Sequence, residues 1–70
     1  MAERVYKIIE LVGTSPDSWE KAAAAAVEKA AGSLRDLRIA EVSELDMQLE
    51  NGKVQNYRAK IKVSFRYEDA

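Results

Sequence analysis

The stretch "GTSPDSWEKAAAAAVEKAAG", residues 13–32, decides the fold because it predicts one amphipathic helix between extended segments. Ser15 is a favourable N-cap, and Pro16 suits the first helical position. The helix is expected to run to Ala31, with Gly32 as the C′ residue. Its apolar positions follow the helical spacing i, i+3, i+4, i+7: Trp19, Ala22, Ala23, Ala26, Val27, Ala30 and Ala31. Because alanine is small, such a helix can lie close against a sheet.

The segment before the helix, "RVYKIIELV" (Arg4–Val12), predicts a strand that ends at Gly13, because it is rich in β-branched and aromatic residues. Its two alternating sets are both apolar: Val5, Ile9 and Leu11 on one face, and Tyr6, Ile8 and Val12 on the other. A strand that is apolar on both faces is expected to be covered on both faces. One helix covers only one of them, so the second face indicates contact with another subunit.

Two long strands are predicted after the helix, over Leu34–Glu50 and Lys53–Tyr67, with the hairpin signal "ENGK" between them. A one-residue slip exchanges the faces of a strand, so the register has to set apolar side chains opposite apolar ones. Pairing residues whose numbers sum to 104 does so, with these pairs: Met47–Tyr57, Leu45–Ala59, Ile39–Phe65, Asp46–Arg58 and Glu44–Lys60. This register predicts a three-residue loop at 51–53 or a bulge near it. A second bulge is expected around Glu41 and Val42.

These elements predict an α+β fold in the order β-α-β-β, a single domain over residues 1–70 with a three-stranded antiparallel sheet packed on one helix. A chain this short buries only roughly 60% of its unfolded surface, and it has no cysteine for disulfides. The two long strands approach about 45 Å at roughly 3.3 Å per residue, so they overhang the helix. We therefore expect a homo-oligomer with closed symmetry.

The composition narrows the function classes. Eleven basic and twelve acidic residues, with no block of like charge, argue against nucleic-acid and membrane partners. The chain has no histidine and no cysteine, so the usual general base and the usual transition-metal ligands are missing. No motif sets a base beside Ser15, and we expect no enzyme activity. The first residues, "MAERVYK", carry no apolar signal segment, so a cytoplasmic protein is the default expectation.

Glu44 and Asp46 form the candidate metal site. They share one strand face, with about 7 Å between their Cα atoms by strand rise. Oxygen ligands suit a hard cation such as calcium, which takes about 6–8 of them, so water or a neighbouring chain would have to supply the rest. The register sets Arg58 and Lys60 opposite, which equally fits a cross-strand ladder of ion pairs. The helix start offers a similar choice between capping and a cation contact, with these residues: Asp17, Ser18 and Glu20.

Two motifs carry a resemblance to a known family. They are "ELVGTSPDSWEKA" at residues 10–22 and "KVSFRYE" at residues 62–68, and the order of elements and the length agree over nearly the whole chain. In these features the chain resembles the dodecins. The resemblance implies a subunit of a hollow homo-dodecamer with tetrahedral symmetry, whose partners are further copies of itself and a small ligand or cation. Most studied dodecins bind flavins, which they store without catalysis.

The flavin pocket of that family implies particular positions here. Its stacking tryptophan matches Ile39, its flavin-bonding glutamine matches Arg58, and Gln48 lies at or near the same pocket. Isoleucine lacks the aromatic stacking, worth about 1 kcal/mol beyond burial, and arginine offers no acceptor. The sequence looks more like a branch that lacks this tryptophan and is described as binding calcium. The resemblance thus implies a calcium-binding shell. The alternatives are a flavin (FMN or riboflavin) dodecin with a tryptophan-free pocket, and a purely structural assembly module.

Overall fold

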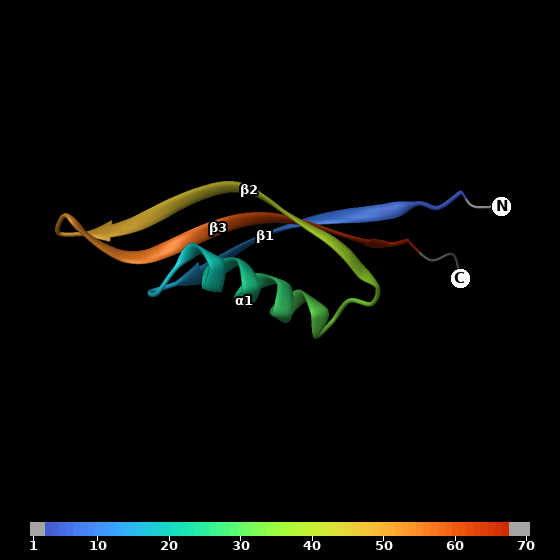
Figure 1. Cartoon of the computed structure of the whole chain (residues 1–70), viewed down its shortest axis with the longest axis horizontal. Helices are drawn as coiled ribbons and strands as arrows, with labels where there is room; N and C mark the ends of the chain where they lie inside the picture. Colours follow the sequence, from blue (N-terminus) through green and yellow to red (C-terminus); the bar gives the residue numbers. More distant parts are fainter. Residues whose placement is uncertain (1–2, 68–70) are drawn as a thin grey trace.

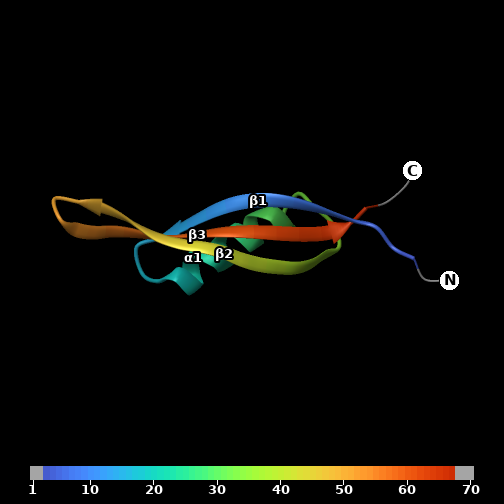
Figure 2. The ribbon, with the colours of Figure 1, turned by 90° about the horizontal axis from the view of Figure 1, so that it is seen from above.

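The computed structural model describes residues 3–67, in the order β1 (Tyr6–Ser15), α1 (Trp19–Ala31), β2 (Leu37–Glu50) and β3 (Lys53–Arg66). The strands form one antiparallel sheet in the order β1-β3-β2. The helix α1 lies along one face of this sheet (Figure 1), and the view from above shows β3 between the other two strands (Figure 2). The predicted α+β fold and its β-α-β-β order are confirmed.

β1 continues through Gly13, where the sequence predicted its end, and stays paired with β3 as far as Ser15. The helix that lies over this position explains why the residue is a glycine. A Cβ atom on Gly13 would overlap the main-chain oxygen of Ala22 and lie 3.1 Å from Cβ of Ala26. Gly13 therefore marks a close approach of helix and sheet, and it does not break the strand.

The helix begins one turn later than predicted. Its N-cap is Ser18, whose Oγ accepts a hydrogen bond from the main-chain N–H of Lys21 at 3.0 Å. Ser15, the predicted N-cap, ends β1 instead and accepts a hydrogen bond from the N–H of Asp17 at 3.0 Å. Because Ser15 still pairs with β3, the chain needs three more residues, beginning with Pro16, to leave the sheet and turn onto its face.

The predicted end of the helix at Ala31 is confirmed. Gly32 is the C-cap, with a right-handed φ of −71°, and not a left-handed C′ residue. The N–H of Leu34 still donates to the carbonyl of Ala30 at 2.8 Å, so β2 begins at Leu37 and not at the predicted Leu34. Over the described residues, no helix has the length and apolar character needed to cross a membrane.

The predicted hairpin register is confirmed in its central part, with these pairs: Met47–Tyr57, Asp46–Arg58, Leu45–Ala59 and Glu44–Lys60. The turn itself has two residues, Asn51 and Gly52, with φ angles of 53° and 75°, as in a type I′ turn. A bulge at Gln55 then shifts the pairing by one residue. Of the two predicted alternatives, the bulge near the turn is correct and the three-residue loop is not.

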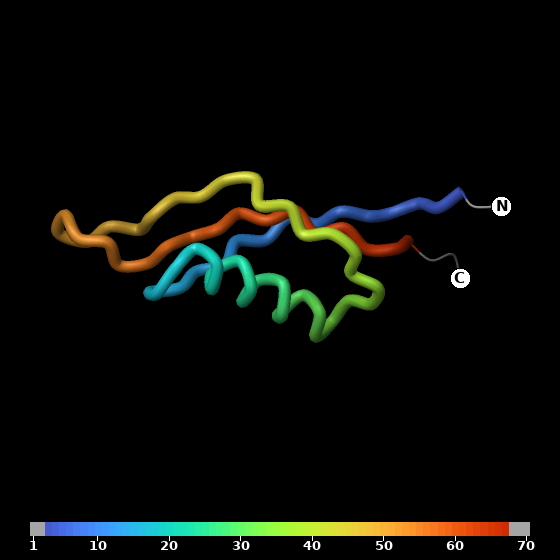
Figure 3. The backbone as a smooth tube through the Cα atoms, viewed as in Figure 1, coloured from blue at the N-terminus to red at the C-terminus, as the bar shows by residue number. Residues whose placement is uncertain are grey.

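β2 contains a second bulge at Ser43, next to the position where the sequence predicted one. Pairing with β3 passes directly from Val42 to Glu44, and the Ser43 Oγ donates a hydrogen bond to the carbonyl of Lys60 at 3.1 Å. The backbone of β2 makes a visible step near its middle (Figure 3). The extra residue is thus accommodated without breaking the sheet.

This bulge changes which residues of β2 share a face. Leu45 on one side of it and Val42 on the other both lie on the face that carries the helix, because one extra residue resets the alternation. The predicted pair of Ile39 with Phe65 is therefore wrong. Ile39 pairs with Ser64 and lies on the face away from the helix.

The core lies between α1 and the middle of β3 and is small. Its buried apolar residues are Ala22, Ala26, Ala30, Ala59, Ile61 and Val63. Half-buried side chains of β1 and α1 surround it, including Ile9, Leu11 and Val27. Eleven large apolar side chains of residues 3–67 remain at least 45% exposed. The molecule measures 55 × 20 × 15 Å, and the hairpin projects beyond the helix (Figure 1), so one helix leaves much apolar surface uncovered.

Candidate functional site

The face of the sheet away from α1, called the outer face from here on, carries a row of basic residues on β3 with acids beside them. The pairs across the strands are Arg58 with Asp46, Lys60 with Glu44, and Lys62 with Glu41 on one side and Glu10 on the other. Directly opposed residues project from the same face and interact there. The outer face is therefore a ladder of alternating charge, as the register predicted for its first two rungs.

The rung between Arg58 and Asp46 is bidentate. The Nε of Arg58 lies 2.7 Å from Oδ1 of Asp46, and the Nη2 lies 2.9 Å from Oδ2. These hydrogen bonds lower the pKa of Asp46 below its ordinary value, and Asp46 in turn raises the pKa of Arg58. The planar guanidinium matches the carboxylate geometry, so this is the best-formed rung of the ladder.

The neighbouring rung joins the Nζ of Lys60 to Oε1 of Glu44 at 3.1 Å. The hydrogen bond from Lys60 to Glu44 raises the pKa of the lysine, and the charge of nearby Glu10 acts in the same direction. The side chains of both rungs are 43–67% exposed, so water and salt screen the pairs. The ladder stabilises the sheet only weakly, and its carboxylates stay accessible to a competing cation.

The two candidate metal residues, Glu44 and Asp46, lie on the outer face one rung apart, as predicted. In residues 3–67 no group of three or more acidic, histidine or cysteine side chains is placed so that it could hold a metal ion. A single chain therefore brings two carboxylates together, and their four oxygens fall short of the about 6–8 oxygen ligands that calcium takes.

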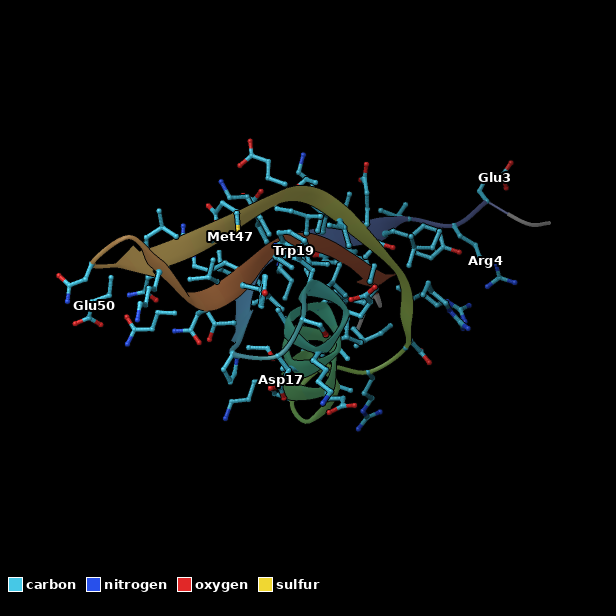
Figure 4. The ribbon with its side chains drawn as sticks, turned by 60° about the vertical axis from the view of Figure 1, so that its left-hand side comes forward. Glu3, Arg4, Asp17, Trp19, Met47 and Glu50 are labelled. Carbon is cyan, nitrogen blue, oxygen red and sulfur yellow. The ribbon has the colours of Figure 1, made fainter. Side chains whose placement is uncertain are left out.

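Trp19 holds the strand at this position, a contact that the sequence did not predict. Its indole Nε1 donates to the main-chain carbonyl of Asp46 at 3.1 Å. Its ring packs edge-on against Tyr57, with centroids 5.0 Å apart and planes at 68°. Figure 4 shows Trp19 at the start of α1, with its side chain between the helix and the sheet. The only signal for this contact in the sequence was the predicted pairing of Tyr57 with Met47. That pairing places Tyr57, the ring that Trp19 contacts, beside Asp46.

The helix start, the other candidate for a cation contact, is occupied by ordinary helix contacts. Ser18 caps the helix, and the carboxylate of Asp17 lies 3.2 Å from the Nζ of Lys21 in the next turn. Glu20 is exposed in the first turn, where its charge suits the positive end of the helix dipole. The structure thus favours the capping role for these residues.

The three positions implied by the flavin pocket do not come together in one chain. Ile39 is 67% exposed beside a hollow of about 210 Å³. Gln48 lies nine residues further along β2, about 30 Å by strand rise, and accepts a hydrogen bond from Asn56 at 3.1 Å. Arg58 lies between them with its guanidinium engaged by Asp46. Any pocket that used all three would need more than one copy of the chain.

Comparison with known proteins places the chain in a family. The sequence model of the family described as Dodecin matches residues 5–68. The chain belongs to the Dodecin family. This dodecin is 48% identical over 66 residues to the calcium dodecin of Mycobacterium tuberculosis, with 94% of this chain and 93% of that protein covered. It is 39% identical over 66 residues to the dodecin of Thermus thermophilus, with 94% and 96% covered.

Solved dodecin structures share the fold. The dodecin of Streptomyces coelicolor superposes with a TM-score of 0.93 at 37% identity, over the whole of both chains. The M. tuberculosis calcium dodecin, described as calcium chelating with a novel calcium-binding site, gives a TM-score of 0.84 at 47% identity and covers 94% of each chain. Neither relative has the name of an enzyme. The resemblance inferred from the two sequence motifs is therefore confirmed, for the calcium dodecin as well as for the family.

Proposed function

We propose that this dodecin assembles into a hollow homo-dodecameric shell that binds a divalent cation, calcium, and catalyses no reaction. The observation that carries the proposal is the exposed pair Glu44 and Asp46, one rung apart on the outer face of β2. Its setting supports the assignment, since the chain is 48% identical to a protein named calcium dodecin.

The donor chemistry fits calcium as part of a larger site. Glu44 and Asp46 offer four carboxylate oxygens, and calcium takes about 6–8 hard oxygen ligands. Water and residues of neighbouring copies would complete the set. A bound cation would supply positive charge that holds these oxygens together. It would have to compete with Arg58 and Lys60, but exposed ion pairs are weak and screened by salt.

The same face argues against a flavin. The family's stacking tryptophan is replaced by Ile39, whose aliphatic side chain has no ring to stack on an isoalloxazine. Arg58, at the glutamine position, has no acceptor group, and Asp46 occupies two of its donors. We therefore assign the outer face to a cation and not to a flavin.

Thermal melting with and without calcium tests the proposal. A cation that binds the native state at 100 times its Kd adds about 2.7 kcal/mol to the unfolding free energy, which raises the Tm by about 4–8 °C per kcal/mol in a domain of this size. The variant Glu44→Gln/Asp46→Asn should lose this rise. The matched control Glu28→Gln/Glu50→Gln removes two exposed carboxylates elsewhere and should keep it.

Each outcome of the melting experiment is decisive. A rise that survives in Glu44→Gln/Asp46→Asn shows that other residues bind the cation. Absence of a rise in the unmodified protein contradicts the calcium assignment, and an equal rise with magnesium contradicts its selectivity. Gel filtration at the monomer mass would contradict the shell itself.

A fluorescence titration with FMN and riboflavin tests the flavin alternative. We expect no quenching at micromolar protein, and we expect that Ile39→Trp creates or strengthens quenching because it restores an aromatic ring. Clear quenching by the unmodified chain would establish a tryptophan-free flavin pocket and reject our assignment.

A further inference from the structure

The turn between β2 and β3 presents an asparagine followed by a glycine. Asn51 and Gly52 are the two residues of this turn, with φ angles of 53° and 75°, and both are exposed. The hairpin carries them beyond the helix (Figure 1), and Figure 4 shows Glu50, the residue before them, at the far end of the hairpin. An open hollow of about 320 Å³, lined by Glu50, Asn51 and Lys53 among others, gives water access to the turn.

The two groups of this turn that can react with each other are held by few contacts. Within residues 3–67, no hydrogen bond engages the side-chain amide of Asn51 or the main-chain N–H of Gly52. A Cβ atom on Gly52 would have no atom within 4 Å, so nothing shields the nitrogen of that residue. A side-chain-bearing residue stays in the left-handed region only where its surroundings hold it there. Asn51 can therefore turn its side chain toward the nitrogen of Gly52.

We propose that Asn51 is a site of spontaneous deamidation in the folded protein. The main-chain nitrogen of Gly52 loses its proton to hydroxide and bonds to Cγ of Asn51. The bond from Cγ to the side-chain nitrogen breaks, and this nitrogen takes up a proton and leaves as ammonia. Water then opens the resulting succinimide ring at one of its two carbonyl carbons, which leaves aspartate or isoaspartate at this position. The net reaction consumes one water and releases one ammonia, and no oxidant or other reactant is needed.

The second of the two asparagines, Asn56, is an internal control because its surroundings differ. Its Nδ2 donates a hydrogen bond to Oε1 of Gln48 at 3.1 Å, and the residue lies inside β3. The nitrogen that would have to attack it belongs to Tyr57, which pairs with both neighbouring strands. A paired strand cannot close the succinimide ring without breaking its pairing, so the reaction is confined to Asn51.

Either product alters the tip of the hairpin. Each one places a carboxylate beside Glu50 and adds one negative charge to the formal net charge of −1. Isoaspartate also carries the main chain through its β-carbon, which lengthens a turn whose geometry requires two ordinary residues. The pairing next to the turn should loosen as a result. This inference goes beyond the proposed function and depends on neither calcium nor the shell.

Peptide mapping of the folded protein tests the proposal. Trypsin cuts after three residues that separate the two asparagines: Arg38, Lys53 and Arg58. After incubation of the folded protein, peptide 39–53 should give two new species of equal mass, which are the aspartate and isoaspartate forms, while peptide 54–58 stays unchanged. A sample taken before incubation corrects for conversion during digestion. The rate should rise about tenfold per pH unit near neutrality, because the glycine nitrogen attacks as its anion and each unit changes that fraction tenfold.

The variant Asn51→Gly is the matched control, since Gly-Gly also suits a type I′ turn but has no amide to lose. Its peptide 39–53 should stay unchanged, and new species there would place the reaction at another residue and contradict the proposal. An unmodified protein that converts only after unfolding in urea would show that the turn protects Asn51, which would overturn the proposal. Equal conversion of Asn56 would refute the structural selection, and aspartate without isoaspartate would rule out the succinimide route.

Discussion

Replacing Gly13 by alanine tests the close approach of α1 to β1. The added methyl would overlap the main-chain oxygen of Ala22 and lie 3.0 Å from its carbonyl carbon and 3.1 Å from Cβ of Ala26. Carbon atoms in ordinary contact lie about 3.5–4.0 Å apart, so the helix has to move outward by at least about 0.5 Å. Ala22 is fully buried, and the movement therefore disturbs the core directly. Overpacking costs about 1–3 kcal/mol, and we expect about 3 because backbone is the obstacle.

Urea denaturation followed by the fluorescence of Trp19 measures this loss. Trp19 is the single tryptophan and joins α1 to β2 by a hydrogen bond, so its emission reports separation of helix and sheet. The protomer concentration is held fixed, because assembly adds to apparent stability. The matched control is Gly32→Ala, where φ is −71° and the nearest atom lies 3.4 Å from the new Cβ. Alanine there should be neutral or stabilise by about 0.4–1 kcal/mol. A loss below about 0.5 kcal/mol for Gly13→Ala, within the usual range of inconsequential surface changes, would refute the close approach.

Three further predictions follow from the sheet. Deleting Ser43 should lower the unfolding free energy by only about 1 kcal/mol, the contribution of its hydrogen bond, because the pairs on either side of it then become consecutive. Deleting Leu45 should lower the unfolding free energy much more in the same urea assay, since Glu44 would turn toward the core. Gly52→Ala should cost about 1–2 kcal/mol, as φ is +75° with no atom within 4 Å, and a neutral result would contradict the type I′ turn. Because the pKa of Asp46 is lowered from 3.8, its ion pair stabilises the fold above that pH and stops doing so as the pH falls through the lowered pKa. Unfolding free energies of the unmodified protein and Asp46→Asn should therefore differ slightly at neutral pH and converge in acid, and a gap that widens in acid would contradict the pairing.

The register of the hairpin could be predicted because the polarity of its side chains is strongly one-sided. Ala59 and Ile61 alternate with Arg58 and Lys60 along β3, and only one register matches that alternation with the acids of β2. The prediction failed at Ile39, beyond the bulge at Ser43. An apolar residue on the outer face gives no mismatch that would reveal the shift. A pair of opposite charges across two strands therefore indicates the register, whereas a single aliphatic residue does not.

The candidate site was predictable to the same extent. Two rungs of the ladder follow from the register alone, but the contact of Trp19 with the carbonyl of Asp46 depends on where the helix starts. The N-cap was predicted at Ser15, one turn before Ser18. Both serines suit a cap by residue type, and the choice between them depends on how far β1 stays paired, which is a tertiary effect. The helical spacing groups Trp19 with the apolar positions of the helix, and its polar contact with β2 was therefore missed.

The spacing of the acids in β2 explains how the strand keeps its acidic and its apolar side chains on opposite faces of the sheet. Glu41, Glu44 and Asp46 are separated by three and then two residues, and in a regular strand the first interval would turn Glu41 to the opposite face. The bulge at Ser43 takes up the odd residue, so all three acids stand opposite basic residues of β3. The apolar residues between them, Val42 and Leu45, consequently stay together on the face that carries α1. The proposed cation site on one side of the sheet and the exposed apolar residues Val42 and Leu45 on the other thus depend on the same bulge.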